Sequence, residues 1–250
     1  MDAAATVKEN DFVELEYTAK IAETGEVFDT TSPEIAKESG IYDGHMTYSP
    51  VVVCVGKRHV VPGLDKQLAG KEAGKTYMAK LPPDEAFGRK NPRLIQLIST
   101  AKFRQQKLMP FPGMQANIDG IAGIVKTVTG GRTIVDFNHP LSGREIEYKF
   151  SIKRVITDLS EKVIAVLKLV GISAHAIKVT ASDSAASIEF PEELPEKLKA
   201  DLEEKLKSAI AGLKAVSFTA RVGAGSNNAN HEKPASGAEA ATGNQQGNHA

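Results

Sequence analysis

The first 158 residues consist mainly of short stretches in which apolar and polar residues alternate, and only one short stretch among them has a helical pattern. The alternation is clearest from Phe12 to Ile21 and from Glu145 to Ile156. A period of two residues is that of a β-strand with one buried face. Because several strands accompany one short helix, we expect an α+β fold in which an antiparallel sheet is wrapped on that helix.

The other elements of this part are marked by turn residues at their ends. A Thr24-Gly25 turn and a Pro82-Pro83 pair are typical strand boundaries, and Gly70 is a typical helix end. We therefore expect further strands at 27–29, 48–55 and 76–81, and a helix that starts near Val60 and ends at Gly70.

An inserted segment interrupts this pattern between Gly88 and His139. From Asn91 to Met114 it is apolar and irregular, and from Ile121 to Phe137 it reads as a hairpin around Gly130-Gly131. Chains tolerate such insertions where the two ends of a loop lie close together. We expect a division into a body (1–88 and 139–158), an insert (89–138), a C-terminal unit (159–222) and a tail (223–250).

After residue 158 the apolar spacing changes to that of helices. Ser160 is expected to cap a helix with Gly171 as its C-cap, and a long helix is expected to open at Pro195. Two short strands lie between the helices, and Ala215 to Val222 is a final strand. The order αββαβ predicts a separate small α/β sandwich.

Residues 223–250 contain no Val, Ile, Leu, Met or aromatic residue. Such a segment cannot bury enough apolar area to offset the entropy of ordering it, so we expect a disordered tail. Its two histidines, His231 and His249, are too widely spaced for a histidine-rich metal tail, and we predict no metal site there.

The charge is unevenly distributed along the chain. With 31 basic and 31 acidic side chains the net charge is zero, which excludes a globally basic nucleic-acid binder. Residues 1–88 carry 9 basic and 15 acidic side chains, whereas residues 89–138 carry 8 and 2. The insert is therefore basic and the segment before it acidic.

Several features favour a cytoplasmic protein with no membrane partner. No apolar run approaches the ~20 residues that a spanning helix needs. The N-terminal residues lack the basic start and apolar stretch of a secretory signal. The single cysteine, Cys54, lies in an apolar strand without a neighbouring base, so we interpret it as a packing residue rather than a nucleophile.

The most specific motif is the run VGKRHVVPGLDKQLAGKEAG, from Val55 to Gly74. It resembles the FKBP family of peptidyl-prolyl cis/trans isomerases, and more narrowly the SlyD-type and long archaeal members that carry an insert-in-flap chaperone domain. The C-terminal unit resembles the extra domain of the long archaeal members, which implies homodimerisation. Supporting motifs in family order are GEVFDTT (25–31), PPDEAFG (82–88), NHPLSG (138–143) and EYKFSIKRV (147–155).

The chemistry of such an enzyme needs no cofactor. Rotation about a peptide bond has a barrier of ~18–20 kcal/mol, and Xaa-Pro bonds isomerise in tens to hundreds of seconds without catalysis. Because no bond is broken, no nucleophile, acid, base or metal is required. An apolar, aromatic-lined pocket that strips water from the proline and favours the twisted amide is sufficient.

The resemblance implies the residues of this pocket. Asp29 is expected to face the twisting carbonyl, and the backbone N–H of Val61 is expected to donate to a substrate carbonyl. Phe87 stands where many members have a tyrosine that donates a hydrogen bond to bound ligand, so we expect weaker macrolide affinity with isomerase activity retained. The implied catalytic residues are Tyr17, Phe28, Asp29, Val60, Val61, Phe87 and Phe150, and the implied substrate-binding residues are Val51, Val53 and Leu64.

The insert is expected to bind unfolded or nascent chains. A small domain hides only ~60% of its surface, so part of its apolar side chains should be exposed, and exposed apolar patches mark binding sites. Its basic residues favour acidic unfolded chains, with ribosomal RNA as the alternative. The candidate residues are Leu94, Ile95, Leu97, Ile98, Phe103, Leu108, Met109, Phe111 and Met114.

Two other interpretations of the whole chain remain open. The small side chains of Val51 and Val53, together with Phe87, favour a holdase that kept the fold without useful catalysis. The basic insert also suits a ribosome-associated folding factor. Taken singly, Phe28 or Leu64 is more typical of an ordinary core position; the ordered set of motifs favours the isomerase.

Overall fold

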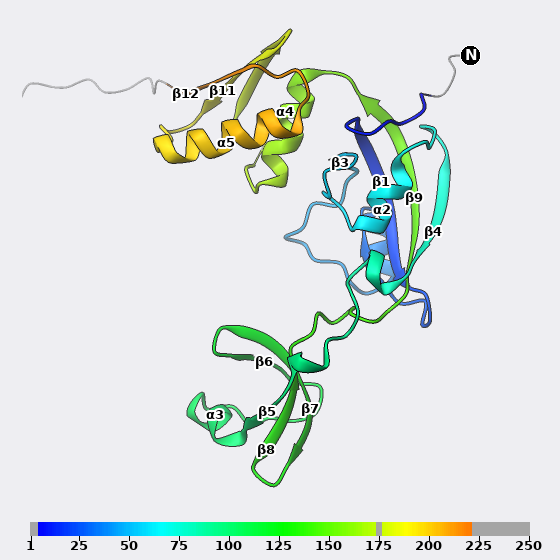
Figure 1. Ribbon diagram of the computed structural model, residues 1–250, viewed down its shortest axis with the longest axis vertical. Helices are drawn as coiled ribbons and strands as arrows, with labels where there is room; N and C mark the ends of the chain where they lie inside the picture. Colours follow the sequence, from blue (N-terminus) through cyan, green and yellow to red (C-terminus); the bar gives the residue numbers. More distant parts are fainter. Residues whose placement is uncertain (1–4, 174–176, 222–250) are drawn as a thin grey trace, which may run out of the picture.

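The structure is a computed structural model that describes residues 5–173 and 177–221 (Figure 1). Its largest sheet joins β1 (Phe12–Ile21), β2 (Val27–Thr30), β3 (Val51–Cys54), β4 (Thr76–Leu81) and β9 (Ile146–Ile156). The strand order is β2-β1-β9-β4, with β3 also paired to β1, and every pair is antiparallel. The expected antiparallel α+β arrangement is confirmed, although β3 is shorter than the predicted strand at 48–55.

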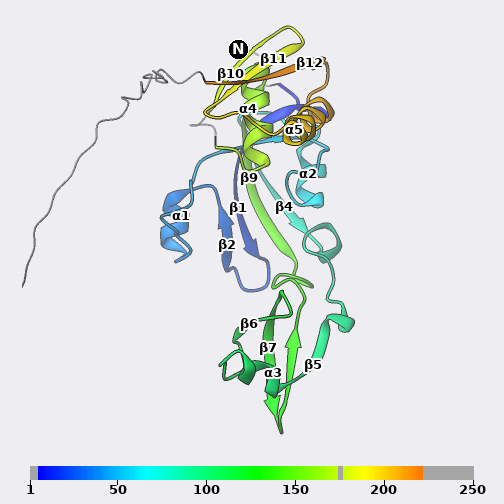
Figure 2. The same ribbon diagram turned by 90° about the vertical axis from the view of Figure 1, so that its left-hand side faces the viewer.

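Two short helices lie near opposite edges of this main sheet, one beside β2 and the other beside β4 (Figure 2). Helix α2 (Pro62–Leu68) buries Leu64 and Leu68 against the sheet, where the sequence predicted a helix. Helix α1 (Pro33–Glu38) was missed, although Ser32 caps it and Pro33 opens it in the manner of a helix start. A 3₁₀ turn, η1 (Pro83–Glu85), follows β4.

The insert forms a second, four-stranded sheet, which lies beyond one end of the main sheet (Figure 1). Its order is β5-β8-β7-β6, and all its strand pairs are antiparallel. The expectation of irregular structure from Asn91 to Met114 is wrong, because this stretch contains η2, β5 and α3. The elements are η2 (Pro92–Leu94), β5 (Ile95–Ser99), α3 (Thr100–Gln105), β6 (Gln115–Ile118), β7 (Ile121–Thr129) and β8 (Arg132–Asp136).

The predicted hairpin of the insert is confirmed as β7 and β8. Gly130 and Gly131 link the two strands, with φ angles of 56° and 80°. A two-residue hairpin turn with positive φ at both positions favours glycine, which has no Cβ to clash with the backbone.

The C-terminal unit has the predicted order of elements, α4 (Leu159–Leu169), β10 (Lys178–Ser182), β11 (Ala185–Phe190), α5 (Glu196–Ala209) and β12 (Ala215–Ala220). Its sheet has the order β10-β11-β12, and the last pair is parallel. The N-cap of α4 is Asp158 rather than Ser160, since the Asp158 carboxylate accepts the Glu161 N–H. The C-cap is Val170, and Gly171 follows it at φ 85°, the position that favours glycine after a helix.

The C-terminal unit shares an apolar core with the main sheet. Phe12, Cys54 and Ile156, from β1, β3 and β9, pack in one cluster with residues of α4, α5 and β11. Strand β3 therefore lies between two cores, because Val53 belongs to the cluster around α2 and Cys54 to the C-terminal cluster. Burial raises the pKa of the Cys54 thiol to about 11, which fits the packing role.

The predictions about the tail and about membrane-spanning helices stand as follows. The predicted tail, 223–250, with His231 and His249, lies outside the described residues. Across 5–173 and 177–221, no helix is long and apolar enough to cross a membrane.

Candidate functional site

The predicted pocket residues gather on the face of the main sheet that packs against α2. Tyr17 on β1 and Tyr148 on β9 bring their rings to a centroid distance of 5.8 Å. Both strands alternate, so Tyr17, Tyr148 and Phe150 share the face that carries the body core. The apolar surroundings come from the same alternation that predicted the strands.

One polar contact lies within these aromatic side chains. The Tyr17 hydroxyl donates a hydrogen bond of 2.8 Å to Oδ2 of Asp29, which follows Phe28 on β2. Burial, and then the charge of Asp29, raise the pKa of Tyr17 far above its usual range. The same two causes raise the pKa of Tyr148. Both hydroxyls therefore stay protonated near neutral pH, and Tyr17 acts as a fixed donor to the carboxylate.

Three further rings from distant segments, those of Phe28, Phe87 and His139, pack next to one another at the predicted pocket. Phe28 meets Phe87 edge-on at 5.7 Å, and Phe87 stacks on His139 at 4.8 Å with the two planes 2° apart. Phe87 and His139 flank the insert in the sequence. The Ser142 hydroxyl donates to the Phe87 carbonyl at 3.1 Å, so the two ends of the insert are tied together beside the pocket.

The predicted lip of the pocket is half-buried and borders the same core. Val60 and Val61 pack against the body cluster, and Val61 is the N-cap residue of α2. Within the described ranges, no hydrogen bond uses the Val61 N–H, so this donor is available in the way that the sequence analysis expects. Val51 is also half-buried beside this cluster.

Three predicted pocket residues lie beneath the surface. Leu64, Val53 and Phe150 are all at most 2% exposed and belong to the body core. Phe150 packs on Tyr77 at 5.6 Å, so it supports the pocket from below. The aromatic ring of β9 that packs against Tyr17 is Tyr148, not the predicted Phe150. Tyr148 was not predicted, although it lies two residues before Phe150 on the same face of β9. His139 was also missed, and only its place in the NHPLSG motif pointed to it.

The insert exposes some of its predicted binding residues and buries others. Phe103 is fully buried at the centre of the insert core, so its expected contact with client chains is wrong. Ile98, Leu108 and Met114 are half-buried against this core. The exposed members are Leu94, Ile95, Leu97, Met109 and Phe111, to which the structure adds Ile121 and Ile134.

Leu97 and Ile134 form an apolar pair on the outer face of the insert sheet. They are direct partners in the β5·β8 register, and both are exposed. Cross-strand partners of this kind lie side by side on one face. Sequence periodicity did not reveal Ile134 as exposed, because the hairpin pattern does not show which face the insert core covers.

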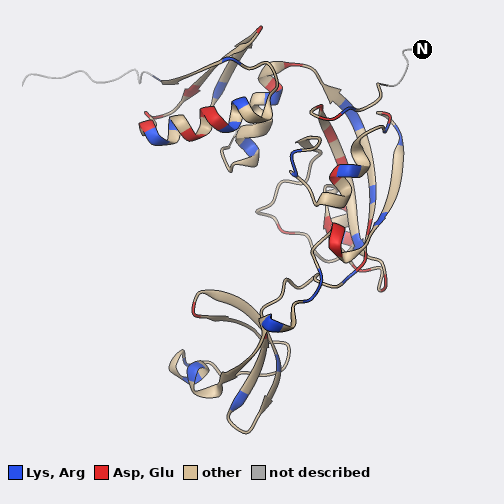
Figure 3. Cartoon of the chain, in the orientation of Figure 1, with Lys and Arg blue, Asp and Glu red and all other residues tan. Residues whose placement is uncertain are grey.

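Basic residues outnumber acidic ones along the insert (Figure 3), and ion pairs neutralise part of this charge. Lys102 pairs with Asp119 at 2.7 Å, and Arg89 with Asp84 at 2.6 Å. Lys90 and Lys126 each lie 3.9 Å from Asp136. In the described part of the chain, the insert cations without an ion pair are Arg93, Arg104, Lys107 and Arg132.

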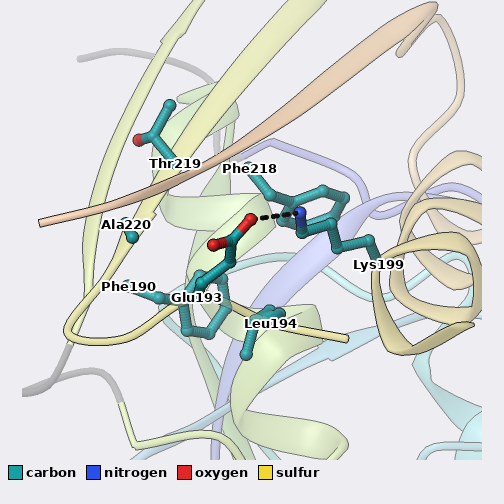
Figure 4. A pocket seen from close by; sticks show the side chains of 7 residues that line it. All are labelled: Phe190, Glu193, Leu194, Lys199, Phe218, Thr219 and Ala220. Carbon is teal, nitrogen blue, oxygen red and sulfur yellow. Dashed lines mark ion pairs between the residues drawn. The ribbon is translucent and has the colours of Figure 1, made fainter. Parts of the chain in front are cut away.

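A separate small cavity of about 190 Å³ lies in the C-terminal unit (Figure 4). Phe190 and Phe218 line it together with Leu194, and Lys199 lies 3.7 Å from Glu193 at its edge. Lys199 also contacts Glu196 at 2.7 Å, so its charge is neutralised. None of the site residues predicted from the sequence lines this cavity. No group of three or more His, Cys, Asp or Glu suited to a metal occurs among the described residues.

Two family models match different parts of the chain. The model described as FKBP-type peptidyl-prolyl cis-trans isomerase matches residues 3–105. The model described as FKBP26, IF domain, matches residues 96–141, which include all four strands of the insert sheet except the first residue of β5.

Curated relatives match about three fifths of the chain. A short-type peptidyl-prolyl cis-trans isomerase of Methanocaldococcus jannaschii is 31% identical over 149 residues, which cover 60% of this chain and 94% of the relative. A 16 kDa FKBP-type isomerase of Escherichia coli is 26% identical, with the same two coverages. The FKBP-type isomerase SlyD of Aeromonas hydrophila is 30% identical over 161 residues, which cover 60% of this chain and 65% of the relative.

Proposed function

This chain belongs to the FKBP-type peptidyl-prolyl cis-trans isomerase family and is an enzyme of that class, and we propose that it isomerises Xaa-Pro bonds of unfolded chains that its insert holds nearby. The reaction takes place, in this proposal, between Tyr17, Asp29, Tyr148, Phe28 and Phe87. The observation that carries it is the carboxylate of Asp29, held by the Tyr17 hydroxyl among aromatic rings.

The pocket suits a rotation that breaks no bond. Apolar walls exclude water from the proline ring, which removes solvent hydrogen bonds that favour the planar amide. The Val61 N–H is placed to donate to a substrate carbonyl, and Asp29 faces the carbonyl that turns. Because every 1.4 kcal/mol of preference for the twisted amide raises the rate about tenfold, such contacts are sufficient for catalysis.

Replacement of the pocket carboxylate tests the catalytic site. We expect Asp29→Ala to lower kcat/KM at least about tenfold on a short Xaa-Pro peptide, since the peptide is too small to need the insert. Glu38→Ala, which removes an exposed carboxylate of α1, is the matched control and should leave the rate unchanged. Equal rates for Asp29→Ala and wild type would instead support a holdase that does not use this pocket.

The insert is proposed to act as the chaperone part of the molecule. The exposed Leu97–Ile134 pair and the exposed Met109 and Phe111 support this, because exposed apolar side chains bind apolar stretches of unfolded chains. The match to the FKBP26 IF domain model and the likeness to SlyD support it further. Binding next to the pocket raises the local concentration of Xaa-Pro bonds, as in any two-site ligand.

A paired substitution separates client holding from catalysis. Leu97→Ser with Ile134→Ser should reduce suppression of aggregation several-fold and slow the catalysed refolding of a proline-limited protein, with the peptide rate unchanged. Met78→Ser removes an apolar side chain that is 67% exposed on β4 of the body and should change neither property. Full aggregation suppression by the double variant would exclude this pair as the client surface.

The unpaired insert cations favour a second partner, ribosomal RNA near nascent chains. Arg93 and Arg104 are exposed and have no ion pair in the described residues, whereas Lys102 is held by Asp119. Neutralising Arg93 and Arg104 should abolish a salt-sensitive cosedimentation with ribosomes if RNA is the partner, and neutralising Lys102 should matter less. We propose unfolded chains as the main ligand because apolar side chains accompany the charge.

Assembly and location complete the proposal. We propose a cytoplasmic homodimer that pairs through the C-terminal unit. The solution mass of the full chain at several concentrations tests the dimer, and a monomer mass throughout would exclude it.

A further inference from the structure

The loop from Gly56 to Val61, which carries the lip of the pocket, is held by one carboxylate of α2. Asp65 accepts the N–H of Gly56 through Oδ1 and the N–H of Arg58 through Oδ2, both at 2.9 Å. Gly56 and Arg58 have φ angles of 84° and 57°. Because left-handed backbone is unfavourable for arginine, the loop depends on these fixed contacts. They hold its first half, up to Arg58.

The second half of the loop has a different anchor, His59. Its Nδ1 accepts the backbone N–H of Cys54 at 3.0 Å. Cys54 is the last residue of β3, and β3 pairs only with β1 among the described strands. The His59 ring therefore satisfies an N–H at the open edge of the strand, immediately before Val60 and Val61. Because Cys54 is buried, leaving its N–H unpaired would cost stability.

The anchor point itself, Cys54, lies in the interior of the molecule. Cys54 is fully buried, and its Sγ lies 3.7 Å from the Asn10 carbonyl and 3.7 Å from the Ala209 carbonyl at the end of α5. Its neighbour Val53 packs in the body core on the other face of β3. The hydrogen bond from Cys54 to His59 thus ties the lip to a strand that is clamped between two apolar cores.

We propose that His59 is a positioning residue of the isomerase, which places Val60 and Val61 at the pocket by accepting the Cys54 N–H, and that it does so only as neutral imidazole. A protonated ring carries a hydrogen on Nδ1 and cannot accept, so two donors would face each other. This inference rests on the proposed function, in which Val60 and Val61 form the lip.

The surroundings of His59 favour the neutral ring. Burial lowers its pKa most, the charge of Asp65 on α2 opposes this, and Lys57 of the same loop lowers it further. On the Cys54 side of the contact, Asp11 before β1 and Lys162 on α4 are further charges from other elements that act on the Cys54 thiol. A folded-state pKa below that of the unfolded chain means that the contact is complete at neutral pH and is lost as the pH falls below the usual histidine range.

Two substitutions in the full-length chain test the role of the acceptor. His59→Asn places an amide oxygen near the position of Nδ1 and cannot titrate, whereas His59→Leu removes the acceptor. On a short Xaa-Pro peptide, we expect wild-type kcat/KM to fall several-fold between about pH 8 and about pH 5. The asparagine variant should keep the neutral-pH rate and lose most of this dependence, and the leucine variant should be about tenfold slower at every pH.

The other histidine at the pocket is the matched control. His139 stacks on Phe87 and accepts the Leu141 N–H through Nδ1, so it is a second imidazole acceptor beside the pocket. His139→Asn should leave the pH dependence of the wild type in place. If this variant flattens the profile and His59→Asn does not, the switch belongs to His139 and the inference about His59 is wrong.

A measurement on the wild type avoids any variant that fails to fold. The Cys54 amide should be strongly protected from hydrogen exchange at neutral pH, and its protection, corrected for the intrinsic rate, should fall at acid pH more than that of Val53 on the same strand. Equal behaviour of the two amides, or unchanged rates in both His59 variants, would overturn the inference. Loss of activity in Asp29→Ala alongside that result would leave the proposed catalytic pocket intact.

Discussion

The body and the insert place their apolar side chains in opposite ways. Around α2, fourteen buried residues form one cluster, and the pocket aromatics rest directly on it. The insert core has five buried residues, with Phe103 as the largest, while Leu97, Met109, Phe111 and Ile121 are each more than half exposed. A catalyst needs walls that hold one geometry, whereas a surface for varied clients needs apolar groups that water can reach.

The difference follows from size as well as from function. A sheet of four strands with one short helix cannot cover both of its faces, so one face remains open to solvent. Asn138 also joins the two ends of the insert, where the chain leaves the body and returns to it. Its amide donates to the Asn91 carbonyl and accepts the Asn91 N–H, and its side chain also donates to Asp136 at 2.7 Å. These hydrogen bonds fix the insert sheet where it joins the body, while several of its apolar side chains remain exposed to solvent.

The largest expected effect comes from removing the centre of the insert core. Phe103→Ala should destabilise the insert by about 3–5 kcal/mol, the usual cost of truncating a buried phenylalanine. With so few buried residues, the insert should unfold while the body stays folded. Hydrogen exchange should then show unprotected amides in β5 to β8 and protected ones in β1 and β9, with the short-peptide isomerase rate retained.

The same substitution at an exposed position is the control for that result. Phe111→Ala, at a residue 60% exposed, should change stability by less than about 0.5 kcal/mol and should reduce only client binding. If Phe103→Ala unfolds the whole chain in one step, the two regions are one cooperative unit and the comparison between them fails.

The long strands of the body were predictable because β1 and β9 alternate along their length, whereas β3 is shorter than predicted and α1 was missed. The bounds of β1 and β4 match the prediction, and the order of the C-terminal elements does too. In the insert, alternation did not predict the elements between Asn91 and Met114. There, Ile95 and Leu97 share the exposed face of β5, while Ile98 on the other face packs against the insert core, so apolar residues occur on both faces and the alternation that marks a strand is lost.

The pocket was predictable where a motif fixed the residue and was missed where only geometry did. The FD pair gave Asp29, and the contact of Asp29 with Tyr17 then depended on the register of β1 and β2. Tyr148 and Phe150 share one strand face, so alternation alone cannot say which ring meets Tyr17. His139 is more than fifty residues from Phe87 in the sequence. The two rings stack only because the two ends of the insert meet in the folded chain.

A smaller effect is expected from removing the hydroxyl that donates to Asp29. Tyr17→Phe leaves Asp29 without its hydrogen bond and should lower kcat/KM about tenfold on a short Xaa-Pro peptide. Aggregation suppression should not change, because the insert makes no use of this contact. Tyr42→Phe, at an exposed tyrosine of the loop after α1, is the matched control and should be silent.

The pH response of the pocket sharpens this prediction. The raised pKa of Tyr17 means that the hydroxyl keeps its proton well into the alkaline range, so ionisation of Tyr17 should cause no loss of activity up to about pH 10. A rate that falls between about pH 8 and about pH 10 in the wild type and stays flat in Tyr17→Phe would show that Tyr17 ionises there, and that its hydroxyl is more exposed to solvent than the structure places it.

The smallest expected effect comes from adding one hydroxyl to each region. In Phe87→Tyr the new group stands at the pocket wall, where many family members use a tyrosine to bind ligand, and a neutral hydrogen bond contributes about 1 kcal/mol. Macrolide affinity should therefore rise about fivefold, with kcat/KM on the peptide changed by less than about twofold. Phe111→Tyr makes the same chemical change on the insert, where it should leave macrolide binding unchanged because the ring is exposed to solvent. Calorimetric titration of both variants measures the difference. Equal affinities for the two variants would mean that Phe87, although it meets Phe28 edge-on and stacks on His139, does not face the bound ligand, and that the pocket lies closer to Tyr148 and Val61.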